Sequence, residues 1–153
     1  MNVRHRTRCI PGAALALIAA AASPSAGASL GDEVGSIDRD RAALQGVTQV
    51  TAGAGYETHE IAHPGGSVRQ YVAGGRVFAV SWEGATTPDL TRLLGTYHTR
   101  YAALVRPQPG NHHVVAVNAD GLSIAVERVL RASRGRVVLT TLVPSAVAAA
   151  GVR

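Results

Sequence analysis

The sequence has a single cysteine and no lysine. Cys9 is the only cysteine, and it precedes an apolar run at residues 10–22 in a segment that we expect to be removed. The mature protein is therefore expected to have no disulfide, thiolate nucleophile or cysteine metal site. Lysine is absent, so every fixed positive side chain is an arginine. No apolar run reaches the roughly 20 residues of a membrane-spanning helix, so no integral membrane segment is expected.

The first 28 residues have the layout of a secretory signal peptide. Three arginines between positions 4 and 8 precede the apolar run, and the small residues Ala26 and Ala28 follow it at the spacing of a cleavage site. We expect cleavage between Ala28 and Ser29 and a mature protein in the periplasm or outside the cell. A lipoprotein is not expected, because its acceptor cysteine would occupy the position of Ser29.

The mature chain would carry little net charge. Twelve arginines remain after residue 28 against ten aspartates and glutamates, a net charge of +2. There is also no strip in which basic and aromatic residues alternate, so we predict no nucleic-acid partner. Arg131, Arg134 and Arg136 are interpreted as a basic turn in a solvated loop, with binding of an anionic partner as the alternative.

Composition divides the mature chain into three segments. Residues 29–55 are rich in small residues and are predicted to be a loosely ordered leader with one short helix around 37–44. Residues 56–146 are predicted to form a single domain, and residues 147–153 a C-terminal tail.

Six runs of β-type residues separated by turn residues predict strands. They are residues 56–63, 68–73, 76–83, 113–117, 122–130 and 136–143. The third run has apolar or small side chains on both faces, so it is expected in the middle of a sheet. Phe78, Val80 and Trp82 would share one of those faces.

One amphipathic helix is predicted between the third and fourth strands. Thr87 would cap it, Pro88 suits its first position, and Asp89 lies near its positive end. Its apolar stripe consists of Leu90, Leu93, Leu94, Tyr97, Tyr101 and Leu104. The order β-β-β-α-β-β-β predicts an α+β fold, a mostly antiparallel sheet of about six short strands with one helix packed on it.

The segment from His59 to His63 spells the zinc-protease pattern H-E-x-x-H. That chemistry requires a helix, on which His59 and His63 would bind zinc while Glu60 acts as the base. Glycines and Pro64 flank the segment and β-branched residues lie within it, so we predict a strand instead. In a strand the two histidines lie about 13 Å apart. Arg69 stands where the longer zinc-protease pattern has its third histidine.

No other residues form a coherent catalytic or binding group. His98 is expected on the exposed side of the helix, and His112 and His113 at the start of a strand. Trp82 is interpreted as core, with the lining of a ligand groove as the alternative. There is no G-x-S-x-G elbow for a serine nucleophile. We therefore predict no catalytic, metal-binding or cofactor-binding residue, with His59, Glu60 and His63 as the alternative zinc site.

Four motifs in the middle of the chain carry a family resemblance. They are Val68-Arg69-Gln70-Tyr71-Val72, residues 77–84, Pro88-Asp89-Leu90 and residues 93–97. This combination resembles the DUF2844 family of exported proteobacterial proteins of unknown function, over about residues 56–143. Gln70, Ser81 and His98 depart from the residues usual in that family. The resemblance implies export and the α+β architecture, and it implies no catalytic residue.

The leading hypothesis from the sequence is an exported, non-catalytic binding or accessory module, whose partner is a protein or a component of the cell envelope. A small zinc hydrolase that uses His59, Glu60 and His63 is one alternative. A structural protein of the cell envelope is another.

Overall fold

The computed structural model describes residues 30–106, 114–129 and 131–147. Within them, seven strands form one antiparallel sheet in the order β1-β2-β3-β4-β7-β6-β5. The strands are β1 (Val47–Ala52), β2 (Glu57–His63), β3 (Gly66–Ala73), β4 (Arg76–Gly84), β5 (Val114–Ala119), β6 (Leu122–Val129) and β7 (Ala132–Leu139). The predicted α+β class and antiparallel sheet are confirmed, with seven strands rather than six.

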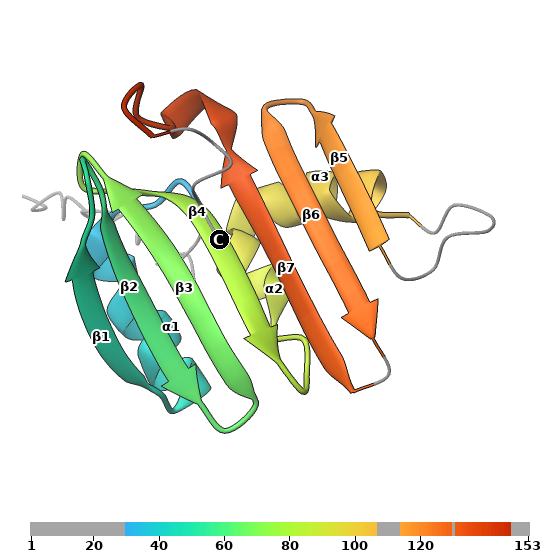
Figure 1. Ribbon diagram of the computed structural model, residues 1–153, viewed down its shortest axis with the longest axis horizontal. Coiled ribbons are helices and arrows are strands. Elements are labelled where there is room, and N and C mark those ends of the chain that lie inside the picture. The colour runs from blue at the N-terminus through green and yellow to red at the C-terminus, as the bar shows by residue number, and fades with distance from the viewer. Residues whose placement is uncertain (1–29, 107–113, 130, 148–153) are drawn as a thin grey trace, which may run out of the picture.

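Helices α1 (Ile37–Leu44), α2 (Leu90–Leu94) and α3 (His98–Leu104) lie on one face of this sheet, and η3 (Thr140–Leu142) lies beyond the end of β7 (Figure 1). The short helices η1 (Val34–Ser36) and η2 (Gly95–Tyr97) directly precede α1 and α3 in the chain. We call the face that carries α1, α2 and α3 the helix face and the opposite face the bare face.

Two antiparallel meanders make up the sheet. Strands β1 to β4 form the first in chain order, and β5 to β7 form the second. The pairing of β4 with β7 joins them, and the segment with α2 and α3 crosses between them on the helix face (Figure 1). The prediction that residues 76–83 form a central strand is confirmed, since β4 is the fourth strand of the order and six of its residues in succession are buried.

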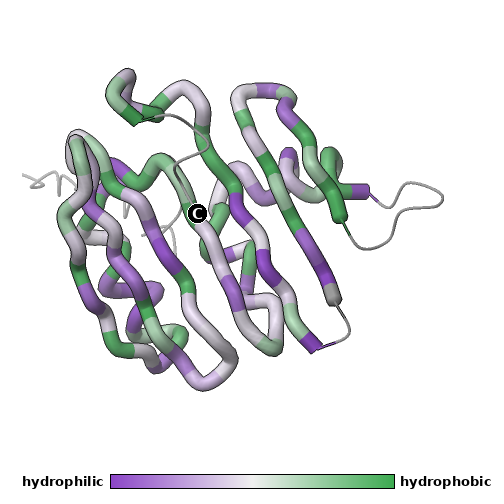
Figure 2. The backbone as a smooth tube through the Cα atoms, viewed as in Figure 1, coloured by the Kyte–Doolittle hydropathy of each residue, from purple (hydrophilic) through white to green (hydrophobic). Residues whose placement is uncertain are grey.

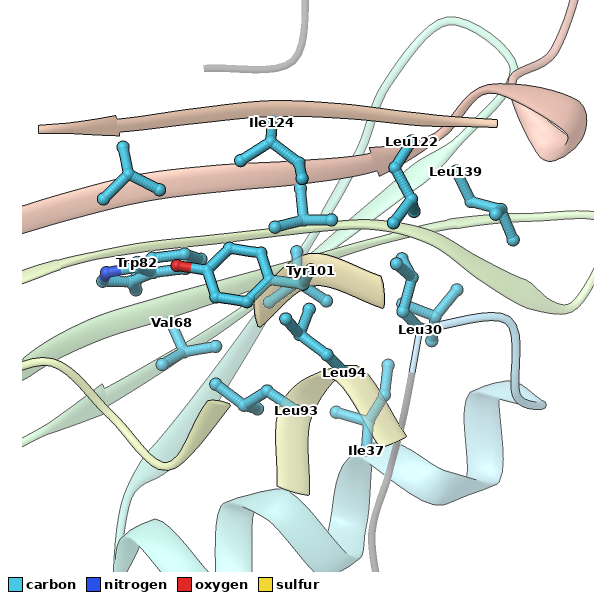
Figure 3. Close-up of a cluster of buried hydrophobic side chains, with 14 of the residues drawn as sticks. Leu30, Ile37, Val68, Trp82, Leu93, Leu94, Tyr101, Leu122, Ile124 and Leu139 are labelled. Atoms are coloured by element: carbon cyan, nitrogen blue, oxygen red, sulfur yellow. The ribbon is translucent and has the colours of Figure 1, made fainter. Parts of the chain in front are cut away.

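The main core lies between the helices and the sheet. Leu122, Ile124 and Leu139 point from the strands toward the leucines of α2 and toward Leu30 (Figure 3). Leu93 and Leu94 are 1% and 0% exposed, so the short α2 contributes its apolar side chains fully to this core. Burial of apolar surface on this scale is the main favourable contribution to folding.

The predicted single helix over residues 88–104 is interrupted. Gly95 has φ 50° and ψ −124°, which is outside the helical region, so α2 ends there and α3 starts at His98. Asp89, rather than Thr87, caps α2, because its carboxylate accepts a hydrogen bond of 3.2 Å from the amide of Arg92. The apolar stripe continues past Gly95, since Leu93 and Leu94 of α2 and Tyr101 of α3 are all buried. Burial raises the pKa of the Tyr101 hydroxyl.

The predicted loosely ordered leader is wrong over residues 30–55. The predicted short helix is present as α1, and β1 adds a strand that pairs with β2 along its full length. Leu30 and Ile37 are 2% and 4% exposed in the core. Sequence reasoning missed β1 because glycines flank a strand whose residues are mostly exposed, so its structure depends on pairing with β2 more than on a buried face.

A buried polar contact ties α1 to the sheet. Asp40 of α1 is 0% exposed and Gln70 of β3 is 1% exposed. The amide Nε2 of Gln70 donates a hydrogen bond to the Asp40 carboxylate. Burying a carboxylate is favourable only when hydrogen bonds replace its water, so this contact fixes which side of α1 faces the sheet.

A smaller core lies on the bare face at the end of the sheet near Tyr56. A bulge opposite Tyr71 and Val72 inserts one extra residue into β4, and Phe78 joins Ala79 and Tyr71 in this second cluster. The prediction that Phe78 shares a face with Val80 and Trp82 is therefore wrong, because the bulge breaks the alternation of the strand. The rings of Tyr71 and Phe78 lie 6.2 Å apart, and Val147 packs on the cluster.

Glycine is required at position 135, where the two meanders meet. Gly135 of β7 is paired directly with Trp82 of β4. A Cβ atom on Gly135 would lie 2.2 Å from Cζ2 of the Trp82 ring. The indole Nε1 also donates to the hydroxyl of Ser133 at 3.3 Å. The ring of Trp82 therefore occupies the space that any larger residue at position 135 would need.

We predict that Gly135→Ala lowers the free energy of unfolding by about 1 to 3 kcal/mol, because the added methyl group overpacks the junction against Trp82. Urea unfolding followed by circular dichroism measures this change. Trp82→Leu shortens the side chain, so the same glycine substitution in that background should cost much less. Equal losses in both backgrounds would contradict a steric conflict between these two residues.

Candidate functional site

The bare face has a groove of about 400 Å³ that crosses the junction between the two meanders. Five neighbouring strands, from β3 to β5, supply its lining. The side chains of the bare face that line it are Ser67, Arg69, Ser81, Glu83, Val114, Ala116, Ala125, Glu127, Arg134 and Arg136. A hollow of this size is within the range of small-molecule sites.

Strand register places these side chains in two rows across the sheet. The first row, from β3 to β5, is Arg69, Ser81, Arg136, Ala125 and Ala116. The second row is Ser67, Glu83, Arg134, Glu127 and Val114. Neighbours in a row lie on strands about 4.8 Å apart, so their side chains interact directly. Figure 2, which looks onto the bare face, shows hydrophilic and hydrophobic segments alternating along β6 and β7.

Two ion pairs hold charged side chains at the groove. Arg69 donates a hydrogen bond of 3.1 Å to Glu60 on β2, and this bond raises the pKa of Arg69. Arg134 lies 3.3 Å from Glu127. Both pairs are partly exposed, so they contribute more to the orientation of the side chains than to stability.

The two arginines of β7 have different neighbours. Arg134 lies between two carboxylates, Glu83 on β4 and Glu127 on β6. Arg136 lies between two small residues, Ser81 on β4 and Ala125 on β6. Both arginines and the small residues beside Arg136 are among the residues that line the groove.

Ser81 supplies a hydroxyl at the floor of the groove. It is 8% exposed, and its Oγ lies 3.4 Å from the hydroxyl of Tyr71. Its cross-strand neighbours are Arg69 and Arg136. The hydroxyl therefore lies in a row of the groove in which the residue on each neighbouring strand is an arginine.

The H-E-x-x-H segment lies in β2, as predicted from its flanking glycines and proline. His59 pairs across the sheet with Gln70 and its Nε2 lies 3.4 Å from Glu57, whereas Nδ1 of His63 accepts a hydrogen bond of 3.1 Å from the amide of Gly65. Glu60 is held by Arg69. Over the part of the chain that the structure describes, no three histidine, cysteine, aspartate or glutamate side chains gather as metal ligands.

Other predictions about single residues have mixed outcomes. Arg134 and Arg136 lie in β7, so their interpretation as part of a solvated turn is wrong. His98 is half-buried and stacks on Tyr101 at 6.3 Å, where an exposed residue was expected. Trp82 is 3% exposed in the main core. His112 and His113 lie outside the described residues.

Sequence reasoning did not identify the groove. Arg69, Ser81 and Arg136 are far apart in the chain, and only the register of β3, β4 and β7 places them in one row. Residues 134–136 read Arg-Gly-Arg, and in a strand two residues that are two positions apart lie on the same face. This spacing could have indicated that Arg134 and Arg136 share one face of a strand. None of the helices in the described ranges is long and apolar enough to cross a membrane.

We predict that the chain without residues 1–28 binds no stoichiometric zinc, because His59 and His63 are about 13 Å apart in an extended strand. Titration calorimetry and elemental analysis measure the affinity and the metal content. The variant with His59→Ala and His63→Ala should give the same weak signal as the unaltered chain. Tight zinc at one ion per chain that disappears in this variant would establish a metal site in β2.

Comparison with known proteins identifies a family and no function. The family model described as "Protein of unknown function (DUF2844)" matches residues 26–152. No curated protein and no solved structure matches the chain significantly. The match extends from before the first described residue to beyond β7, so it includes α1, β1 and every strand of the groove. The chain therefore belongs to the DUF2844 family.

Proposed function

We propose that this protein is an exported, non-catalytic binding module that holds its ligand in the groove on the bare face. The groove itself is the observation that carries the proposal. Its floor is built from β4, β7 and β6, which are paired on both sides and therefore hold their side chains in fixed positions. Side chains on rigid central strands form a preorganised surface, which reduces the entropy lost when a ligand binds.

The chemistry of the groove supports binding rather than catalysis. Glu127 is ion-paired with Arg134 at 3.3 Å, so its carboxylate already has a partner within the protein. Ser81 has Arg69 and Arg136 as its cross-strand neighbours, and its hydroxyl lies 3.4 Å from the hydroxyl of Tyr71, so neither a histidine nor a carboxylate is among these neighbours. These groups are suited to orienting an anionic or polar ligand.

Export is the second part of the proposal, and the first 28 residues support it. They combine an arginine-rich start, a short apolar run and the small residues Ala26 and Ala28. Cleavage after Ala28 would keep Leu30, whose amide donates to the carbonyl of Leu93 and whose side chain is 2% exposed. The proposed cut would thus leave the core intact.

We predict that expression of the full chain in a bacterium with a general secretion pathway yields a periplasmic or secreted protein that begins at Ser29. Intact-mass spectrometry of the soluble fractions identifies the first residue. Ala28→Glu should block cleavage, because the pocket of the signal peptidase accepts only small residues. The control Ser25→Thr should be processed normally. A cytoplasmic product of full mass from the unaltered chain would contradict export.

We predict that Ala125→Trp weakens binding in the groove about tenfold or more, because the indole fills the space over β6. Anilinonaphthalene sulfonate, an anionic apolar dye, serves as the probe, and its fluorescence is titrated with each protein. Ala52→Trp, at an exposed position of β1 outside the groove, is the matched control and should bind like the unaltered chain. Circular dichroism verifies that both variants fold. Dye binding that is unchanged in Ala125→Trp would argue against the groove as the site.

A further inference from the structure

We infer that the groove and the outer edge of β5 together bind an extended, uncharged segment of a partner protein, which pairs with β5 as an added strand. A large apolar side chain of that segment lies over Ala116 and Ala125 in the groove. This inference rests on the proposed function, since it names the partner of the same groove.

Strand β5 is the last in the order of the sheet, and it borders the groove. Among the described residues it pairs only with β6. Its residues alternate between exposed and half-buried, and Val114 is 50% exposed. The strand has neither a charged residue nor a proline, and its register with β6 is regular. Charges, prolines and bulges are the usual features that keep an edge strand from pairing, so β5 is open to an added strand.

The turn between β5 and β6 determines which backbone groups of β5 point away from the sheet. Asp120 and Gly121 have φ values of 52° and 76°, as in a two-residue type I′ turn. Such a turn closes on a hydrogen-bonded pair, here Ala119 and Leu122, and in an antiparallel ladder bonded and non-bonded pairs alternate. The residues of the non-bonded pairs direct their amides and carbonyls outward, and on β5 they are Val114, Ala116 and Asn118.

An extended peptide backbone is the ligand that matches this row of outward groups. In antiparallel pairing each outward residue exchanges two hydrogen bonds with the residue opposite it. Donors and acceptors on β5 recur about every 7 Å, which is the spacing of two residues in a strand. A hydrocarbon chain offers no partner to these groups, whereas strand addition gives every one of them a partner.

The groove provides room for a side chain of the added strand. Ala116 of β5 and Ala125 of β6 are direct neighbours in the first row, and both line the groove. An added strand lies about 4.8 Å beyond β5, and its residue opposite Ala116 points to the bare face as Ala116 does. A leucine or phenylalanine at that position reaches over both methyl groups, and covering them removes apolar surface from water.

Charge and side-chain size distinguish the segment from a second copy of this chain. Because β5 has no ionisable side chain, a charged segment finds no ion-pair partner on it, and an uncharged segment is complementary. Self-pairing of β5 in a symmetric antiparallel pair centred on Ala116 would place Ala116 opposite itself. Val114 would then lie opposite Asn118, so no large side chain would extend over Ala125. A segment with a large residue opposite Ala116 therefore fills the groove better than a second β5.

The test uses a blocked heptapeptide that alternates threonine with valine and has phenylalanine at its centre. Titration calorimetry measures its affinity for the chain without residues 1–28. We expect the affinity to fall about tenfold when alanine replaces the central phenylalanine, because the groove loses its apolar occupant. Ala125→Trp, which fills the groove, should lower the affinity for the phenylalanine peptide to that for the alanine peptide. Ala52→Trp is again the matched control.

Two methylated peptides test the backbone pairing. A methyl group on the amide of the central phenylalanine blocks its hydrogen bond to the carbonyl of Ala116, so the affinity should fall about tenfold or more. The same methyl group on the amide of the next threonine, which points away from β5, is the matched control and should change the affinity less than about twofold. Ala116→Pro removes the outward amide of β5 itself and should also weaken binding, with circular dichroism verifying that this variant folds.

The possible failures are distinguishable. Equal affinities of the two methylated peptides would overturn strand addition at β5, and equal affinities of the phenylalanine and alanine peptides would overturn the side chain in the groove. A dimer that Ala116→Pro converts to a monomer, measured by light scattering, would overturn the partner segment in favour of a second copy. In each of these cases, loss of dye binding in Ala125→Trp would still support the groove. Dye binding that is unchanged in that variant would contradict the proposed function itself.

Discussion

The packing of Trp82 across Gly135 is the contact on which the rest of the structure depends. It lies where β4 and β7 pair, and this pairing joins the meander of β1 to β4 to the meander of β5 to β7. The indole is held on the helix face by Ser133 and by the core around α2 and α3. Because residue 135 has no side chain, the two strands can stay in register under a ring that would otherwise force them apart.

The one-sided arrangement of helices determines where a site can form. Helices α1, α2 and α3 cover the apolar residues of the helix face, and Asp40 ties α1 to Gln70 through a buried hydrogen bond. The second cluster around Phe78 covers one end of the bare face. Among the described residues, no helix covers the stretch from β3 to β5 that contains the groove, with its arginines, serines and alanines. The main core and the groove thus lie on opposite faces of the same central strands.

Much of the fold was predictable because local patterns agreed with it. The short helix at 37–44 is present as predicted. The central position of β4 follows from its apolar residues on both faces, and the strand at the H-E-x-x-H segment follows from its flanking glycines and proline. The errors occurred where a single residue changed the local geometry or where strand pairing decided the structure. Gly95 interrupted the predicted helix, the bulge at Phe78 reversed the predicted face, and β1 is a strand because β2 pairs with it.

The sequence by itself determined the α+β class, the elements and the family, because periodicity, turn residues and motif combinations are local properties of the chain. Only the tertiary structure decided which residues form the groove. Arg69, Ser81, Arg136 and Ala125 come from four strands, and the register that aligns them depends on the pairing of β4 with β7. A shift of that register by one residue would turn Arg136 and Ala125 to the other face relative to Arg69 and Ser81, and this register is set by two strands that lie far apart in the chain.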